Sequence, residues 1–185
     1  ELIYLIARER QRAGRAVGGV VGTLMSNFGM EKAIQALGLE FVRANVGDRY
    51  VMAALESRGW SLGGEASGHI VCLDKATTGD AIVAALQVLA AMVSSGKSLH
   101  ELKAGMSKYP QVLINVRLAQ KIDVKTVPSV QKAVAHAESR LADQGRVLLR
   151  ASGTEPLIRV MVEGADAALV QELAEELAEV VRNSL

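Results

Sequence analysis

A short polar segment between two apolar runs combines residue types that are suited to binding an anion. Arg150 supplies a guanidinium fork, and Ser152 and Thr154 supply hydroxyl groups. Gly153 lets the backbone approach a ligand closely, and successive N–H groups in such a turn can form an anion-binding concavity. These residues predict a phosphate cradle. An ordinary hairpin loop in which Arg150 pairs with Glu155 is the alternative, and chemistry alone leaves both open.

A second segment, residues 63–69, places a carboxylate, a hydroxyl and an imidazole among glycines. Glu65 and Ser67 are two positions apart, so in an extended segment their side chains project to one side and could clamp vicinal sugar hydroxyls. His69 could exchange protons near neutral pH. A structural interpretation also stays open, because Gly-Gly and Ser-Gly pairs mark turns and a single histidine more often has a structural role.

The residues around the first segment predict the strands that hold it. Ile158, Val160 and Val162 alternate with more polar positions, which predicts a strand with these three side chains facing the core. Arg159 then points to the opposite face. The apolar run 147–149 predicts the preceding strand, so the polar segment connects two neighbouring strands.

The remaining pattern predicts two domains. Strands alternate with helices over residues 1–106, which predicts an α/β layered domain, and residues 107–185 predict a small α+β domain with helices on one face of a mostly antiparallel sheet. The helix expected over 79–95 is apolar nearly all round, so we expect it to be buried on most sides. The other expected helices are 2–12, 27–37, 48–58, 99–106, 128–143 and one that Asp166 caps; the other expected strands are 16–21, 40–44, 60–62, 69–73 and 112–116.

Composition excludes several classes of function. The chain has 185 residues, 50% of them hydrophobic, and a net charge of +1, so it offers no basic footprint for nucleic acid. Its one cysteine, Cys72, lies in an apolar run and suits a reducing compartment. The longest apolar run, 81–93, is interrupted and too short to cross a bilayer. We therefore expect a cytoplasmic protein that binds neither nucleic acid nor membrane. Because the chain opens with Glu1, we also expect a fragment of a longer protein.

Taken together, the two segments resemble the α-D-phosphohexomutase family. The motifs that carry the resemblance are GEASGH at 64–69 and RASGTEP at 150–156, supported by VGDRY at 46–50 and LDKATTGD at 73–80. The resemblance covers the whole chain, with both loops in order. The sequence SGTEPLIRVMVEG, which begins at residue 152, favours the glucosamine branch over the phosphomannomutase and phosphoglucomutase branches.

The resemblance implies a place for each segment in the family's four domains. Residues 1–106 are similar to the third, sugar-recognition domain, and residues 107–185 to the fourth, phosphate-binding domain. By resemblance Glu65 and Ser67 hold sugar hydroxyls, and His69 takes part in proton transfer. The residues that match the family's phosphate loop are Arg150, Ser152, Gly153 and Thr154.

Two positions fit the resemblance less closely. Arg159 lies beyond the loop, and a surface or structural ion pair explains it at least as well as phosphate binding. Asn45 stands where many family members carry lysine, so a cationic substrate contact is not expected there.

The implied activity needs parts that this sequence does not contain. Family members of the glucosamine branch interconvert glucosamine 6-phosphate and glucosamine 1-phosphate through a phosphoserine and a bisphosphate intermediate, with glucose- or glucosamine-1,6-bisphosphate as activator. Their phosphoserine and their aspartate-rich magnesium loop lie in the first and second domains. The resemblance thus implies recognition of a sugar phosphate, with those missing domains as partners and no metal site in this chain, which alone is expected to be inactive.

Two further hypotheses come from other classes. The first is a non-catalytic module that binds a phosphosugar. The second is a dinucleotide-binding domain, suggested by Gly18, Gly19 and Gly22 after an apolar run, although their spacing is not GxGxxG and tight packing explains them better.

Overall fold

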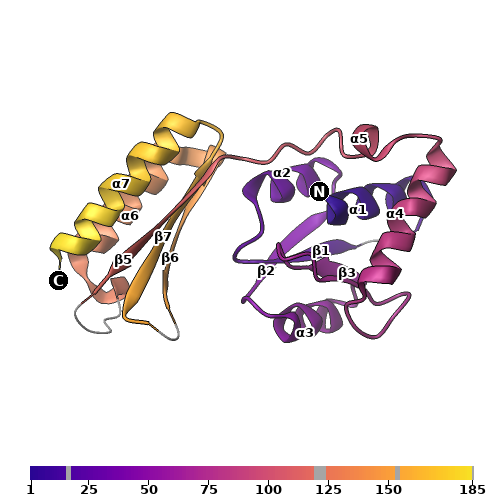
Figure 1. The fold of residues 1–185 in the computed structure, drawn as a ribbon, viewed down its shortest axis with the longest axis horizontal. Coiled ribbons are helices and arrows are strands. Elements are labelled where there is room, and N and C mark those ends of the chain that lie inside the picture. Colours follow the sequence, from indigo (N-terminus) through magenta and orange to yellow (C-terminus); the bar gives the residue numbers. More distant parts are fainter. Residues whose placement is uncertain (16–17, 119–123, 153–154, 185) are drawn as a thin grey trace. The chain divides into compact units, whose positions relative to one another are not determined.

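The structure is a computed structural model that describes residues 1–15, 18–118, 124–152 and 155–184. The chain divides into two compact units, Glu1–Lys108 and Tyr109–Leu185 (Figure 1). Each unit has its own sheet and its own core, so each is described by itself.

The first unit is built on a mixed four-stranded sheet with the order β2-β1-β3-β4. β1 runs parallel to β2 and to β3, and β4 runs antiparallel to β3. The strands are β1 (Gly19–Thr23), β2 (Glu40–Ala44), β3 (Leu62–Gly64) and β4 (Ile70–Cys72), and the helices are α1 (Leu2–Arg12), α2 (Phe28–Ala36), α3 (Asp48–Arg58), α4 (Ala81–Ser95) and α5 (Leu99–Leu102).

Helices cover both faces of this sheet, so the predicted α/β layer is confirmed. Neighbouring strand residues point to opposite faces: Val20 joins the core formed with α1, α2, α4 and α5, and Val21 joins the smaller core under α3. Figure 1 shows α3 below the strands and α1 and α2 above them. With both faces covered, the central strand β1 is buried along its whole length, whereas the edge strand β2 keeps Glu40 exposed.

The helix boundaries follow local sequence signals. Asn27 caps α2 by accepting a hydrogen bond from Gly29 N at 3.0 Å, and Asp80 caps α4 in the same way. Gly59 ends α3 in the left-handed conformation, at φ 64°, which a residue with a side chain adopts only with strain. These ends agree with the expected ones. The helix expected over 99–106 is shorter, since α5 ends at Leu102.

The expectation that α4 is buried on most sides is wrong. Only Ala84, Val88 and Ala91 are buried, because α4 packs against α1 and β4 on one side alone. A stripe of four large apolar side chains remains exposed on the other side: Ile82, Leu86, Leu89 and Val93. Among the described residues, no helix is long and apolar enough to cross a membrane.

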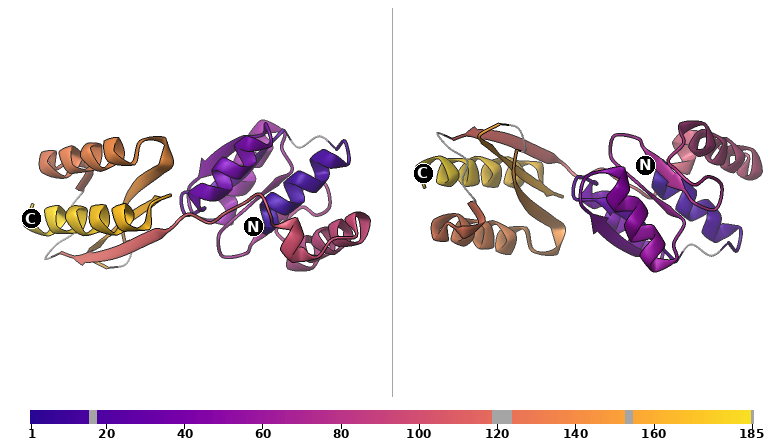
Figure 2. Two further views of the ribbon diagram at one scale, coloured as in Figure 1. Left: turned by 90° about the horizontal axis from the view of Figure 1, so that it is seen from above. Right: turned by 90° about the horizontal axis from the view of Figure 1, so that it is seen from below.

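The second unit has a three-stranded antiparallel sheet with the order β5-β7-β6. Its helices α6 and α7 lie side by side on one face of the sheet (Figure 2), which confirms the predicted α+β arrangement. The strands are β5 (Gln111–Arg117), β6 (Gly145–Ala151) and β7 (Leu157–Gly164), the helices are α6 (Pro128–Leu141) and α7 (Ala167–Asn183), and short 3-10 turns occupy Val124–Thr126 and Ala142–Gln144.

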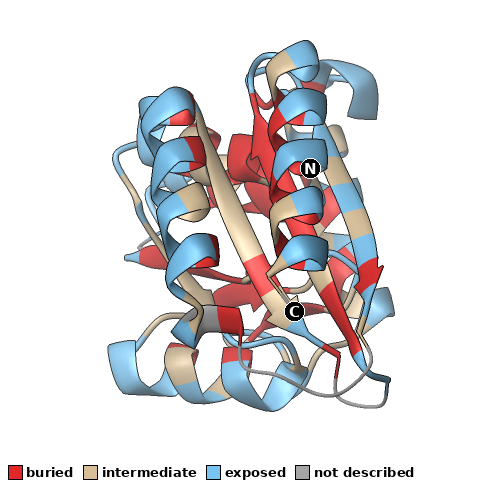
Figure 3. Ribbon diagram, turned by 90° about the vertical axis from the view of Figure 1, so that its left-hand side faces the viewer, coloured by how far each residue is buried: buried red, intermediate tan, exposed pale blue. Residues whose placement is uncertain are grey.

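The core of the second unit lies between the sheet and the two helices. Ile158, Val160 and Val162 are buried against α7, as their alternation predicts. The outward faces of both helices are exposed (Figure 3). The opposite face of the sheet therefore carries the alternate residues of β6 and β7, including Arg150 and Arg159.

Candidate functional site

The hairpin loop, residues 65–69, lies at the carboxyl edge of the parallel strands of the first unit. It follows β3, while the segments after β1 and β2 leave the same edge because the three strands are parallel. Ligands of α/β sheets bind outside the carboxyl ends of the strands. The fold thus places the candidate sugar-binding residues where this class of domain holds its ligands.

The hairpin loop is a tight turn, so the extended conformation expected for Glu65 and Ser67 is wrong. The carbonyl of Glu65 accepts a hydrogen bond from Gly68 N at 3.1 Å, and Glu65 N donates to the carbonyl of His69 at 2.9 Å. The chain has to reverse here because Gly64 and Ile70 are paired across the antiparallel strands β3 and β4. Ser67 stands exposed on the turn, while Glu65 is half-buried beside it.

The carboxylate of Glu65 ties the hairpin loop to the segment between β2 and α3. Its Oε1 accepts a hydrogen bond from Gly47 N at 3.0 Å. Gly47 has φ 127°, a conformation that favours glycine. Asn45, two residues earlier, is exposed. The second carboxylate oxygen of Glu65 has no described hydrogen bond, so it can still accept one from a ligand hydroxyl.

A cavity of about 300 Å³ opens beside Glu65 within the first unit. Ala66 and Gly68 line it from the hairpin loop, and Ser26 and Asn27 line it from the segment after β1. Ser26 and Asn27 are not among the site residues predicted from the sequence. Their position directly after the first parallel strand was the signal that could have identified them.

His69 is held against the backbone of Gly79. A Cβ on Gly79 would collide with the imidazole ring, and the His69 Nε2 atom is buried without a hydrogen-bond partner. Val71 and Gly79 form an isolated bridge that brings the two segments together. The absence of a side chain at Gly79 therefore sets the position of the His69 ring.

Replacing Gly79 with alanine will displace His69. We expect the His69 ring resonances in the proton NMR spectrum to shift, while those of His100 and His136 stay in place, because neither lies near the substitution in the sequence or on the same segment. Thr78→Ala, one residue away, is the matched control and should leave all three histidines unchanged. Unaltered His69 resonances in Gly79→Ala would show that the ring does not rest on this glycine.

The β6–β7 loop, residues 152–156, closes the hairpin of the second unit. Ser152 is buried, and its N–H donates to the carbonyl of Leu157 at 2.9 Å. Its hydroxyl oxygen accepts from Glu155 N at 3.3 Å. Gly153 and Thr154, which the sequence analysis also selected, lie outside the described residues.

Arg150 and Arg159 are brought directly opposite each other on β6 and β7. Directly paired residues of antiparallel strands have their side chains on the same face of the sheet. Both arginine side chains therefore project from the face that α6 and α7 do not cover. Neither has an ion pair or side-chain hydrogen bond within the described part of the chain, and Arg159 Nε is buried without a partner. Glu155 lies 4.0 Å from Arg117, so the alternative pairing with Arg150 is not found.

Two adjacent guanidinium groups without a carboxylate between them repel each other. Like charges directly opposite on a sheet are destabilising. An anion placed between them removes this cost and gains charge-assisted, bidentate hydrogen bonds. The geometry of this sheet face suits the binding of a phosphate group beside the β6–β7 loop.

Comparison with known families agrees with this arrangement. The family model for the α/β/α domain III of phosphoglucomutase/phosphomannomutase matches residues 1–109, and the model for the C-terminal domain of the same family matches residues 113–180. The chain belongs to the phosphoglucomutase/phosphomannomutase family. The resemblance stated from the two loops is confirmed by these matches.

The curated relatives of this chain include phosphoglucosamine mutases from several species. That of Hahella chejuensis is 60% identical over 185 residues, covering 100% of this chain and 42% of the relative. That of Methylococcus capsulatus is 64% identical over 178 residues, covering 96% of this chain and 40% of the relative. The chain thus spans about two fifths of the length of the relatives that it matches.

Solved structures of the same family share the fold. The N-acetylphosphoglucosamine mutase of Aspergillus fumigatus superimposes with a TM-score of 0.81 at 25% identity, covering 99% of this chain and 43% of that one. A complex of the Aspergillus enzyme with GlcNAc-6P and magnesium gives a TM-score of 0.77 at 26% identity, over 98% of this chain and 45% of that one.

The described residues were also compared with the ligand sets that hold metal ions in proteins. Among the described residues, no group of three or more histidine, cysteine, aspartate or glutamate side chains is placed to hold a metal ion. The carboxylate of Glu65 is engaged with Gly47 N and stands alone.

Proposed function

We propose that this chain is the substrate-recognition half of a phosphoglucosamine mutase, which interconverts glucosamine 6-phosphate and glucosamine 1-phosphate. The observation that carries the proposal is the pair of opposed arginines, Arg150 and Arg159, on a sheet face where no described carboxylate neutralises them. The identity of 60–64% to two phosphoglucosamine mutases supports the choice of sugar.

The second unit binds the phosphate of the substrate. Arg150 and Arg159 supply the charge, and Ser152, with Gly153 and Thr154, supplies donors from the β6–β7 loop. In the sequence, Arg159 was equally explained by an ion pair; its buried, unpartnered Nε now favours a role in anion binding.

The first unit binds the sugar ring. Glu65 accepts hydrogen bonds from ring hydroxyls with the carboxylate oxygen that Gly47 N leaves free. Ser67, exposed at the tip of the turn, donates to or accepts from a neighbouring hydroxyl. His69 takes part in proton transfer at a sugar hydroxyl through Nδ1, because its Nε2 is buried against Gly79.

The phosphoryl chemistry belongs to other parts of the full-length protein. A phosphoserine gives its phosphoryl group to the free hydroxyl of the sugar phosphate, the bisphosphate turns over, and the other phosphate returns to the serine. Magnesium, which the Aspergillus enzyme holds in complex with GlcNAc-6P, is bound outside this chain. A bisphosphate of glucose, also found with the Aspergillus enzyme, serves as the intermediate or activator. The present residues grip the phosphate that is not reacting, and such remote binding positions the reacting end.

A chimeric enzyme tests the proposal. The matching segment of the Hahella chejuensis relative is replaced by this chain, which is 60% identical to it over its full length. We expect the chimera to convert glucosamine 6-phosphate to glucosamine 1-phosphate, with kcat/KM for that substrate higher than for glucose or mannose phosphates. The unaltered Hahella enzyme is the control for the assay.

Two other outcomes would contradict the proposal. A preference of the chimera for glucose or mannose phosphates moves the chain to a sister branch of the family. A soluble, folded but inactive chimera, together with tight binding of sugar phosphate by the chain alone, favours a non-catalytic phosphosugar-binding module.

A further inference from the structure

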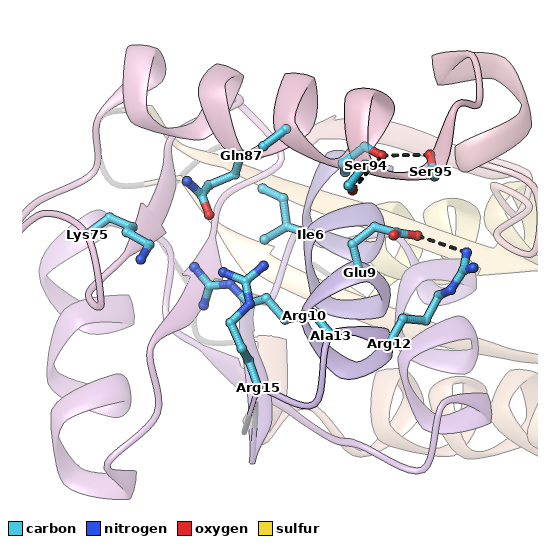
Figure 4. A pocket seen from close by; sticks show the side chains of 12 residues that line it. Ile6, Glu9, Arg10, Arg12, Ala13, Arg15, Lys75, Gln87, Ser94 and Ser95 are labelled. Carbon is cyan, nitrogen blue, oxygen red and sulfur yellow. Dashed lines mark hydrogen bonds and ion pairs between the residues drawn. The ribbon is translucent and has the colours of Figure 1, made fainter.

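A second cavity of the first unit lies between α1 and α4 (Figure 4). Its volume is about 580 Å³, which is within the usual range for sites that hold small molecules. Nothing in the proposed function uses it. It is lined by the last turn of α1 and the residues just after it, by Lys75, and by the face of α4 that includes Gln87 and Ser94.

This cavity lies at the opposite edge of the sheet from the hairpin loop. Arg15, in its lining, precedes β1, so it is at the amino edge of the parallel strands. Lys75 follows β4, which runs antiparallel to β3 and therefore ends at the same amino edge. Glu65 stands at the carboxyl edge, so the two cavities are separate sites.

The lining of the cavity carries an excess of positive charge. Its cations are Arg10, Arg12, Arg15 and Lys75, and its one lining carboxylate is Glu9. A second carboxylate, Asp74, lies 2.6 Å from Arg10 and 3.6 Å from Lys75. Glu9 is already shared, since its Oε1 lies 3.4 Å from Arg8 and 3.5 Å from Arg12. The guanidinium of Arg15 has no ion pair or side-chain hydrogen bond with any described residue. Figure 4 shows the side chains of Arg10, Arg15 and Lys75 among the residues that line the cavity.

Arg10 is fixed in the wall of the cavity. It is 2% exposed and donates to Ser61 Oγ at 3.1 Å and to Asp74 Oδ1 at 2.6 Å. Its Nε is buried without a partner. Asp74 thus compensates the charge of Arg10, but the buried Nε–H remains an unsatisfied donor, which is costly for the fold unless a ligand accepts a hydrogen bond from it.

The dipole of α1 explains the positions of only some of the cations that line the cavity. Basic residues in the last turn of a helix interact favourably with its dipole, which accounts for Arg10 and Arg12. Arg15 lies three residues beyond α1, and Lys75 is not on a helix at all. Lys75 forms an ion pair with Asp74 at 3.6 Å, whereas Arg15 has no described ion pair, so the position of Arg15 at the cavity needs another cause.

We propose that the cavity between α1 and α4 binds a small phosphate-bearing molecule, at a site independent of the sugar phosphate substrate. Guanidinium groups recognise phosphate oxygens in pairs, and a cationic wall of this kind suits a ligand with two or more negative charges. The amide of Gln87 and the hydroxyl oxygen of Ser94 lie across from the cations and are suited to hydroxyl groups on the same ligand.

Pyrophosphate, titrated into the 15N-labelled 185-residue chain at constant ionic strength, is the probe. We expect saturable shifts of the amide resonances of residues 9–15, 74–76 and 87–95. The titration is made in the Arg150→Gln background, which removes a main phosphate contact of the second unit. Because the two sites report through different resonances, failure here leaves the proposed function untouched, and failure of the proposed function leaves this site untouched.

Substitutions of exposed residues test the assignment without threatening the fold. The double variant Arg15→Gln/Lys75→Gln should weaken pyrophosphate binding about tenfold or more, because it removes two of the four charges. Arg49→Gln/Arg58→Gln, which removes the same charge from two exposed positions of α3, is the matched control and should bind as the parent chain does. Well-dispersed spectra of both variants establish that they are folded.

Titrations with further ligands identify the chemical class of molecule that the cavity binds. Citrate, a polyanion without phosphorus, should bind more weakly than pyrophosphate; equal binding would show that the cavity responds to charge alone and would overturn the proposal. ADP and glucose 1,6-bisphosphate separate nucleotide from sugar ligands. Shifts that do not saturate, or that are the same in the Arg15→Gln/Lys75→Gln variant, would also overturn it.

Discussion

Replacing Arg150 with glutamine will lower kcat/KM of the chimeric enzyme for glucosamine 6-phosphate by about 100- to 1,000-fold. The loss corresponds to about 3–4 kcal/mol, the usual effect of removing one partner from a buried, charge-assisted hydrogen bond, at 1.4 kcal/mol per tenfold. KM should rise, because the phosphate is held in the ground state, and kcat should fall as well, because the same grip positions the reacting end.

The same substitution should not destabilise the chain. Arg150 and Arg159 are directly opposite each other, so removing one charge relieves their repulsion and is expected to raise the free energy of unfolding by about 0.2–1 kcal/mol. Urea denaturation of the 185-residue chain measures this. A lower kcat/KM together with a higher free energy of unfolding is expected for a residue that binds the substrate. Replacing an arginine with a structural role would lower both quantities.

Arg182→Gln is the matched control for Arg150→Gln. It removes the same charge from the same unit, on the exposed face of α7, and should leave kcat/KM and stability unchanged. If kcat/KM were unchanged in Arg150→Gln, as it is expected to be in Arg182→Gln, the phosphate role of the β6–β7 loop would be contradicted.

Local signals in the sequence were sufficient for most of the elements. Asn27, Gly59 and Asp80 each act within a few residues, through a cap or a left-handed turn, so the helix ends that they set could be predicted. The alternation of Ile158, Val160 and Val162 likewise identified the core face of β7. Such signals depend on the chain nearby and survive without knowledge of the rest of the fold.

Features that depend on residues far apart in the sequence could not be predicted. The turn at Glu65 follows from the pairing of β3 with β4, and its hydrogen bond comes from Gly47, 18 residues earlier. The opposition of Arg150 and Arg159 depends on the register of a hairpin. The apolar sequence of α4 likewise does not tell how much of its surface other elements will cover.

The glycines at the start of β1 show how tertiary packing decides between two interpretations of one pattern. Gly18 and Gly19 lie against the indole ring of Trp60, which a Cβ at either position would meet. Close packing, which the sequence analysis preferred to a dinucleotide fingerprint, therefore accounts for them. The ring itself lies just before β3, since the strand expected over 60–62 begins at Leu62.

Replacing Gly63 with alanine will destabilise the first unit by about 2–3 kcal/mol, the upper part of the range of about 1–3 kcal/mol that is usual for overpacking a core. A Cβ at Gly63 would lie 2.7 Å from the carbonyl oxygen of Val21 and 3.0 Å from Val51 Cγ1. The carbonyl belongs to β1, the strand next to β3. Since backbone of a central strand cannot move aside as a flexible side chain can, β3 has to shift and carry the hairpin loop with it.

Gly38→Ala separates crowding from backbone strain. Gly38 has φ +75° and open space around its missing Cβ, so alanine there meets strain alone and should cost about 1 kcal/mol. Fluorescence of Trp60, the one tryptophan of the chain, reports urea unfolding of the first unit in both variants. A loss in Gly63→Ala no greater than in Gly38→Ala would show that β1 and β3 do not approach so closely. A greater loss, with the Glu65 amide resonance displaced only in Gly63→Ala, would show that the close packing of the central strands positions the residue proposed to hold the sugar.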